Sequence, residues 1–109
     1  MISGKLSVIK VSEFVIHLEF DSGDCIAAYD VVIFRGQDGT ARSTIQVQAM
    51  SDVAFPVKGY IGHDASEVEV QPGSFVVYFE GGCSVVLTRS HSCHEIGLLS
   101  TSAGISEIH

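Results

Sequence analysis

The sequence predicts an all-β protein, an antiparallel β-sandwich or partly closed barrel built from two repeated β-meanders, with at most one short helix. Three observations support this prediction. Apolar and polar residues alternate along much of the chain, as in "FVIHLEF", which is typical of half-buried strands. Glycine-containing turns separate the apolar segments at short intervals. No apolar pattern with a helical period is long enough for a sizeable helix.

The chain contains an internal repeat. Ile9 aligns with Val68 at an offset of 59 residues, and the copies continue without a gap, so that Leu18 aligns with Val77. Matched apolar positions keep their parity, and alternate side chains of a strand point to one face. We therefore expect a single domain over residues 1–109 with repeats at approximately 5–35 and 64–99. Each copy forms a meander whose apolar face is buried against the other.

A tight turn follows the central strand in each copy. The segments "FDSGDC" (20–25) and "FEGGCS" (79–84) place acidic and small residues with glycine between two apolar runs, which is typical of a hairpin that needs positive φ. The preceding turns fall at "VSEF" and "QPGS". Pro72 followed by Gly73 makes the second of these the stronger turn signal.

The segments outside the meander cores are also predicted to be mainly β. We expect "AAYDVVIFRG" (27–36) to be one long strand with an irregularity near Asp30. A turn at 36–40 leads into a strand in which Ile45, Val47 and Ala49 alternate with glutamines. Residues 51–66 connect the two copies. The tail segment "EIGLLST" is expected to form a last strand or one turn of helix.

Charge and cysteine content restrict the possible partners and compartment. Six Lys and Arg residues against thirteen Asp and Glu give a net charge of −7. Such a surface repels nucleic acid and anionic membranes, whereas it attracts a basic protein. No stretch of eighteen apolar residues and no secretory signal pattern is present. With an odd number of three cysteines, the simplest expectation is reduced thiols in the cytoplasm.

The residues that most suggest chemistry do not form a known catalytic or metal-binding pattern. In "SHSCHE", His91 and Cys93 share a face of an extended strand, but His94 points to the other face and no second ligand pair follows. No strained elbow, helix N-terminus or phosphate-binding loop accompanies a nucleophile. We therefore expect no metal, no cofactor and no enzymatic activity.

The outward-facing residues are the candidates for binding. Carboxylates steer a basic partner towards a surface, and aromatic side chains anchor it. Tyr60 is expected on the same acidic surface. The expected partner-binding residues are His17, Glu19, Asp21, Asp24, Glu67, Glu69, Tyr78 and Glu80.

The two copies, "SVIKVSEFVIHLEFDSG" (7–23) and "SEVEVQPGSFVVYFEGG" (66–82), resemble a known pattern. They are similar to the "V-x-V … L-x-[LF]-x-F-x-[DS]-G" meander of small β-rich immunity proteins from bacterial polymorphic and contact-dependent growth-inhibition toxin systems. The resemblance implies a cytoplasmic protein that binds a toxin domain from a neighbouring cell and blocks its active site. It implies no individual functional residue, because such proteins bind through surfaces that differ between pairs.

Together these observations lead us to expect a non-enzymatic immunity protein. It would bind and block a basic toxin domain, such as a nuclease, through its acidic surface. Two alternatives stay open at this point. One is a small-ligand-binding β-barrel or sandwich with an apolar cavity between the meanders, and the other is an assembly module whose edge strands pair with copies of itself.

Overall fold

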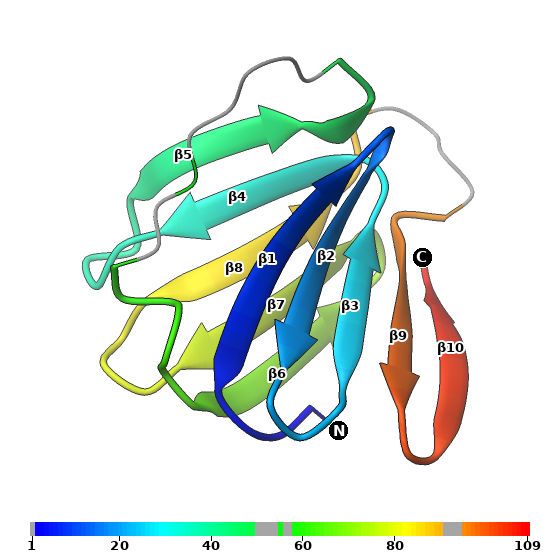
Figure 1. The fold of residues 1–109 in the computed structure, drawn as a ribbon. Coiled ribbons are helices and arrows are strands. Elements are labelled where there is room, and N and C mark those ends of the chain that lie inside the picture. The colour runs from blue at the N-terminus through cyan, green and yellow to red at the C-terminus, as the bar shows by residue number, and fades with distance from the viewer. Residues whose placement is uncertain (1, 50–54, 56–57, 91–94) are drawn as a thin grey trace.

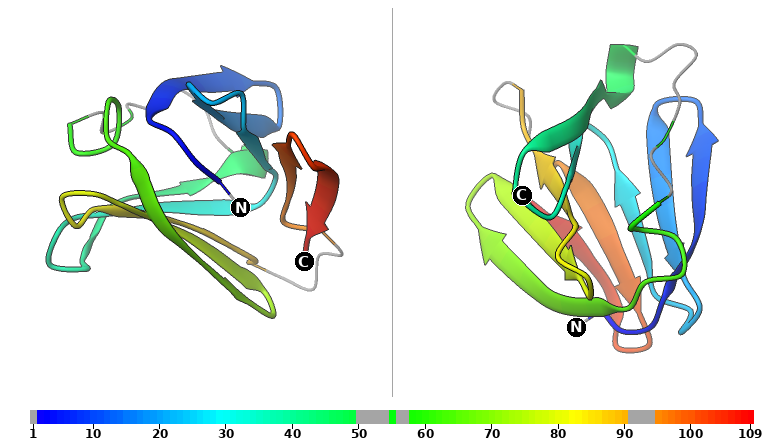
Figure 2. Two further views of the ribbon diagram at one scale, coloured as in Figure 1. Left: turned by 90° about the horizontal axis from the view of Figure 1, so that it is seen from below. Right: turned by 90° about the vertical axis from the view of Figure 1, so that its left-hand side faces the viewer.

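The computed structural model describes residues 2–49, 55, 58–90 and 95–109, and it confirms the predicted all-β sandwich. Two five-stranded antiparallel sheets pack face to face without closing into a barrel (Figure 1 and Figure 2). The described residues include one short 3₁₀ helix, η1 (Val47–Ala49). No helix in these parts of the chain is long and apolar enough to cross a bilayer.

Each sheet combines a three-stranded meander with a two-stranded hairpin. In the first sheet the meander is β1 (Leu6–Ser12), β2 (Val15–Phe20) and β3 (Cys25–Ala28), and the hairpin is β9 (Gly97–Thr101) and β10 (Gly104–Ile108). In the second sheet the meander is β6 (Ala65–Gln71), β7 (Ser74–Phe79) and β8 (Ser84–Thr88), and the hairpin is β4 (Val31–Arg35) and β5 (Ala41–Gln46). The strand orders are β1-β2-β3-β9-β10 and β5-β4-β8-β7-β6.

The two halves of the chain exchange their hairpins. Strands β4 and β5 follow the first meander in sequence, yet β4 pairs with β8 of the second meander. Strand β9 follows the second meander and pairs with β3 of the first. Figure 1 shows the two junctions, with β4 beside β8 in the rear sheet and β9 beside β3 in the front sheet. Neither half can therefore complete its own sheet.

Equivalent contacts recur at the offset of 59 residues. The Ser7 hydroxyl donates to the Glu19 carbonyl at 3.0 Å, and the Ser66 hydroxyl donates to the Tyr78 carbonyl at 3.1 Å. The first strand of each meander also carries a bulge at the same place, between residues 6 and 8 and between residues 65 and 67. The repeat in the sequence is thus a repeat of backbone geometry.

Residues at equivalent positions of the two copies also contact each other. Such contacts are expected near a two-fold symmetry axis. Lys5 and Asp64 form an isolated antiparallel bridge, and their side chains are joined by an ion pair of 3.6 Å. The rings of Phe20 and Phe79 stack between the sheets, with centroids 6.3 Å apart and an interplanar angle of 11°. An approximate two-fold axis therefore passes through the centre of the core.

Asp30 fixes the exchange of hairpins at the point where the chain leaves β3 for β4. Its buried carboxylate accepts hydrogen bonds from the N–H and the hydroxyl of Ser90, both at 2.8 Å. Ser90 lies just after β8, where the second half leaves its own sheet. The Asp30 carbonyl accepts a further bond from the N–H of Val47 at 2.7 Å. One residue therefore joins the two connections that pass between the sheets.

The structure corrects three expectations outside the meanders. Residues 27–36 are two strands in different sheets, because the chain turns at Asp30. Val47 belongs to η1 and is buried, so the strand that contains Ile45 ends at Gln46. In the tail, the strand predicted for "EIGLLST" is confirmed as β9, but it is not the last strand, because β10 follows and pairs with it.

The inner faces of the meanders form the predicted core. Six matched residues are at most 4% exposed, and each contributes on the order of 2 kcal/mol when buried. They are Ile16, Leu18, Phe20, Phe75, Val77 and Phe79. Phe34 of the exchanged strand β4 is fully buried in the same cluster, and Phe55 packs edge-on against it at 6.0 Å. The exchange therefore contributes to the core as well as to the sheets.

The turn between β1 and β2 holds Phe14 in a left-handed conformation. Its φ is 64°, and it is the one described residue other than glycine with a positive φ. The equivalent position in the second copy is Gly73, with φ of 77°. The left-handed conformation costs a residue with a Cβ about 1–2 kcal/mol of free energy. Because Phe14 is 52% exposed, burial offsets little of this strain.

We predict that Phe14→Gly raises the free energy of unfolding by about 1 kcal/mol, because it removes the strain at positive φ. Urea denaturation of the variant measures this difference. The matched change Gly73→Ala should act in the opposite direction, since its new Cβ lies in the left-handed region and 3.3 Å from Arg89 Nε. If Phe14→Gly instead lowers the free energy of unfolding, the contacts of the ring stabilise the fold by more than the strained backbone at Phe14 costs.

We also predict that Asp30→Ala lowers the free energy of unfolding by about 2–3 kcal/mol, because it removes the buried carboxylate that accepts two hydrogen bonds from Ser90. The double variant with Ser90→Ala should unfold at nearly the same urea concentration as Asp30→Ala alone. The exposed Glu13→Ala serves as the control and should stay within about 0.5 kcal/mol of the parent protein. Equal effects of the Asp30 and Glu13 changes would contradict the role given to Asp30.

Candidate protein-binding surface

Strand β6 is an outer strand of the second sheet and carries two of the predicted binding residues. It pairs with β7 on one side, and its other side is the edge of the sheet. Glu67 lies opposite Tyr78 and Glu69 lies opposite Val76, and both glutamates are exposed. Because alternate residues share a face, the two carboxylates project from the same outer face of the sheet.

The bulge at the start of β6 sets the direction of Glu67. Ala65 lies opposite Phe79, which is buried in the core, whereas Glu67 lies opposite Tyr78. In a regular strand Ala65 and Glu67 would share a face, and the extra residue turns Glu67 outward. The hydroxyl of Ser66 holds this irregular backbone by its bond to the Tyr78 carbonyl.

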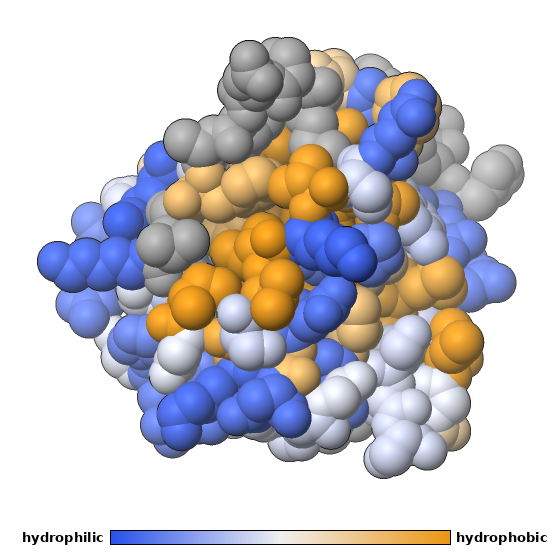
Figure 3. Space-filling view, viewed as in Figure 1, coloured by the Kyte–Doolittle hydropathy of each residue, from blue (hydrophilic) through white to orange (hydrophobic). Residues whose placement is uncertain are grey.

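Two further carboxylates lie near the beginning of the same strand. The N–H of Glu80 donates to the Asp64 carbonyl at 2.8 Å, which places the β7–β8 turn beside β6. The Asp64 carboxylate pairs with the Lys5 ammonium, but both side chains are well exposed, so solvent screens the pair. Figure 3 shows hydrophilic side chains gathered at the lower left, where β1 and β6 begin. We call Asp64, Glu67, Glu69 and Glu80 the acidic edge.

Tyr78 borders the acidic edge and is held in place by Arg35. The guanidinium carbon of Arg35 lies 5.8 Å from the centroid of the Tyr78 ring. The Arg35 Nε donates to the hydroxyl of Ser84 at 2.9 Å, which fixes the guanidinium over the outer face. A fixed aromatic side chain next to Glu67 provides the kind of anchor that carries much of the binding energy at protein interfaces.

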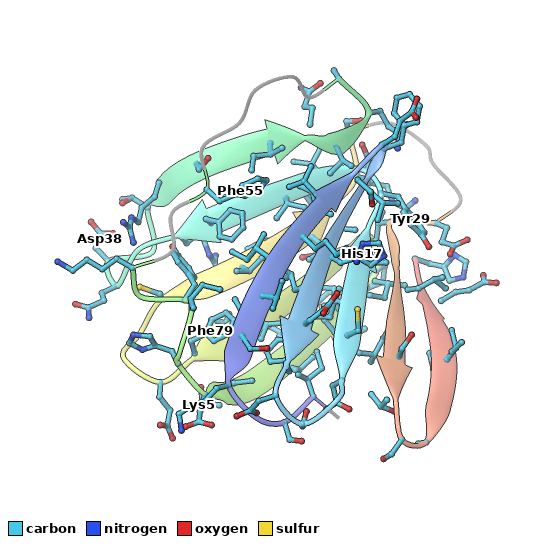
Figure 4. The ribbon with its side chains drawn as sticks, viewed as in Figure 1. Lys5, His17, Tyr29, Asp38, Phe55 and Phe79 are labelled. Atoms are coloured by element: carbon cyan, nitrogen blue, oxygen red, sulfur yellow. The ribbon has the colours of Figure 1, made fainter. Side chains whose placement is uncertain are left out.

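His17 and Glu19 do not belong to this surface. They lie on β2 and project from the outer face of the first sheet, opposite Ala27 and Cys25 of β3. Figure 4 shows His17 on the front sheet, well away from Lys5 at the lower left. Since the outer faces of a sandwich point in opposite directions, a flat partner cannot contact both His17 and Glu69.

The thiol beside Glu19 is poorly suited to nucleophilic chemistry. Burial raises the pKa of Cys25, and the nearby Glu19 carboxylate raises it further. The thiol therefore stays protonated at neutral pH, and the thiolate is the reactive form. Cys25 and Cys83 are both free thiols.

His17 has an unsatisfied nitrogen on this face. Its Nδ1 is buried and has no hydrogen-bond partner among the described residues. The equivalent position in the second copy is Val76, which is buried. A buried polar group without a partner costs about 1–3 kcal/mol. The first sheet therefore holds a polar residue where the second sheet holds an apolar one.

Three residues that were expected on the acidic surface serve the fold instead. Asp24 is only 7% exposed, and the expectation that it faces outward is wrong, because its carboxylate accepts the N–H of Ser3 at 2.9 Å. Tyr60 is fully buried, because its hydroxyl donates to the Arg35 carbonyl and its ring packs in the core. Asp21 stays exposed but accepts the N–H of Lys5 at 2.8 Å.

The structure thus brings together Glu67, Glu69, Tyr78 and Glu80 from the predicted set. Sequence reasoning missed Asp64, although the repeat offset pairs it with Lys5. His91, Cys93 and His94 lie outside the described residues, and the described residues contain no group of three metal-binding side chains. No protein-family model, curated protein or solved structure shows a significant match to the chain.

We predict that His17→Val raises the free energy of unfolding by about 1 kcal/mol, because it removes the unpartnered nitrogen and introduces the residue of the second copy. Urea unfolding measures the change. Ala27→Val, which introduces the residue of the second copy at the neighbouring position on β3, controls for added apolar volume on the same face. A clear loss of stability in His17→Val alone would show that the imidazole makes a stabilising contact.

Proposed function

We propose that the chain is a non-catalytic protein that binds a basic partner protein through the acidic edge. The observation that supports this most directly is the open side of β6. The strand is seven residues long, and its outward carboxylates Glu67 and Glu69 lie beside unpaired backbone groups. Natural proteins protect such an edge with charged side chains, especially lysine, with bulges and proline, or by keeping the strand very short. Strand β6 contains neither lysine nor proline and is regular after its initial bulge, so the charges on its edge are Glu67 and Glu69, which repel acidic segments and attract basic ones.

In this proposal the partner contributes an extended basic segment that pairs with β6 as a sixth strand. Backbone hydrogen bonds supply affinity in this binding mode, and side chains at alternate positions supply specificity. Lysine or arginine residues spaced two apart would meet Glu67 and Glu69, while Tyr78 supplies apolar contact. The equivalent edge strand β1 carries Lys10 at the position of Glu69, so it repels the same segment.

The neutralising role follows from the resemblance to immunity proteins. A toxin whose catalytic cleft binds nucleic acid is basic, and carboxylates on a rigid edge can occupy such a cleft. We place this role in the cytoplasm, where the free thiols of Cys25 and Cys83 would stay reduced.

The pairing mode can be tested by adding a heptapeptide of alternating lysine and threonine to the chain. The amide chemical shifts of the chain report where the peptide binds. We expect saturable shifts along β6, and the double variant Glu67→Gln with Glu69→Gln should bind about fivefold more weakly. Glu19→Gln on the opposite face is the matched control and should bind like the parent chain. Shifts centred on β2, or equal weakening in the control, would place the surface elsewhere.

The neutralising role requires a separate experiment. The protein encoded immediately upstream of this chain should arrest growth when expressed alone, and co-expression of the chain should relieve the arrest. Reversal of charge in Glu67→Lys with Glu69→Lys should abolish that relief while leaving the unfolding midpoint close to that of the parent. Sedimentation of the chain alone tests the competing occupant, a second copy whose β1 pairs with β6.

A further inference from the structure

An open pocket of about 730 Å³ lies at the end of the second sheet. One wall is the turn between β4 and β5, including Asp38, Thr40 and the adjoining Arg42. Lys58 and Gly59 form another wall, and His63 and Cys83 complete the lining. Figure 4 shows Asp38 at the far left, at the tip of this turn. The volume falls within the range of small-molecule sites.

The pocket is basic although the chain is acidic. It contains two of the six Lys and Arg residues of a protein whose net charge is −7. The one carboxylate in the lining, Asp38, is engaged within its own turn. Its Oδ1 accepts the hydroxyl of Thr40 at 2.7 Å and the N–H of Thr40 at 3.0 Å, and these two bonds lower the pKa of Asp38.

The Arg42 guanidinium is held in place before any ligand arrives. Its Nη1 donates to the Lys58 carbonyl at 2.9 Å, and its central carbon lies 5.5 Å from the centroid of the Tyr60 ring. Tyr60 is itself fixed, edge-on against Phe34 at 5.3 Å and Phe79 at 6.1 Å. A guanidinium has five N–H donors, so several stay available to a ligand. A pre-positioned donor loses less entropy on binding.

The phenol behind Arg42 does not neutralise it. Burial raises the pKa of Tyr60 and the nearby Cys83 adds to this, although the Arg42 charge acts in the opposite direction. A neutral phenol leaves the full guanidinium charge directed into the pocket. The ring face still stabilises the cation through its quadrupole.

Gly59 keeps the floor of the pocket open. Its φ is 96°, and a Cβ at this position would lie 2.8 Å from Cys83 Sγ and 3.7 Å from Arg42 Nη1. The guanidinium nitrogen and the sulfur therefore converge on one point beside this glycine. Any side chain here would clash with the sulfur and occupy the space next to the cation.

Comparison of the two copies shows what makes this site positive. Cys83 is the equivalent of Asp24, which in the first copy is a buried carboxylate bonded to Ser3. A carboxylate at position 83 would lie beside Arg42 and cancel its charge. The second copy carries a cysteine there, so no carboxylate at this position competes for Arg42 and Lys58.

We propose that this pocket binds a small organic phosphate, with its phosphoryl oxygens on Arg42 and Lys58 and its organic part against the β4–β5 turn. The lining holds two cationic side chains against one ionised carboxylate, Asp38, and an arginine fork suits phosphoryl oxygens. This site is separate from the acidic edge. It also differs from an apolar cavity between the meanders, because it opens at the end of one sheet and is lined by polar side chains.

The test is an amide chemical-shift titration with inorganic phosphate and with phenyl phosphate, at constant ionic strength set with chloride. We expect saturable shifts at Gly36, Gly59 and Cys83, and tighter binding of phenyl phosphate because it fills more of the pocket. Lys58→Gln should weaken phenyl phosphate about tenfold, because it removes one charged hydrogen-bond donor. Lys10→Gln removes an equal charge from the other sheet and should change the affinity less than twofold.

A second pair of variants tests the argument from the two copies. Cys83→Asp should abolish phosphate binding, whereas Cys83→Ser should retain it, with urea unfolding of both variants confirming that they fold. Chemical shifts that do not saturate, or that chloride alone reproduces, would overturn the proposal. So would an equal loss of phenyl phosphate affinity in Lys10→Gln and Lys58→Gln. Tighter binding of citrate than of phenyl phosphate would also overturn it, in favour of a carboxylate site. Glu67→Gln with Glu69→Gln should leave phosphate binding unchanged, which separates this result from the test of the acidic edge.

Discussion

The hydrogen bonds between the Asp30 carboxylate and Ser90 hold the exchange of hairpins on which both candidate surfaces depend. Strand β4 brings Arg35 to Tyr78 and Ser84 of the second meander, which fixes the aromatic anchor beside the acidic edge. Strand β5 brings Arg42 to the carbonyl of Lys58, which forms one side of the pocket. If β4 and β5 had stayed with the first meander, neither cation would lie where it does. The fold thus builds each surface from residues of both halves.

The differences between the two copies are concentrated on the outside and at the turns. Inner positions stay apolar, because both copies bury them in one core. Lys10 and Glu69 give the two equivalent edge strands opposite charges, and Asp24 and Cys83 give the two equivalent turns different chemistry. A change at an inner position would cost packing energy, whereas the exposed difference between Lys10 and Glu69 costs little stability and alters what each edge strand attracts. The repeat therefore provides an internal reference for where the surface has been adapted.

The meanders could be predicted from sequence because their signals are local. The alternation around Leu18 and Val77 sets which side chains face inward, and the glycines set the turns. The exchange could not be predicted, because it depends on a contact between Asp30 and Ser90 that lies 60 residues away in the chain. For the same reason Asp24 and Tyr60 were expected outside. Their partners, Ser3 and the Arg35 carbonyl, are brought to them by the tertiary fold. The pocket could not be predicted from the sequence, since the spacing of Arg42, Lys58 and Cys83 matches no known binding motif.

The turn between β7 and β8 connects the two surfaces. Glu80 at its start belongs to the acidic edge, and Cys83 at its end lines the basic pocket. His63 also belongs to both regions, because it lines the pocket and its Nδ1 lies 3.0 Å from the Glu80 carbonyl. A carbonyl oxygen only accepts, so Nδ1 carries the proton and the imidazole fixes the turn. A change in the backbone of this turn would therefore move Glu80 and Cys83 together.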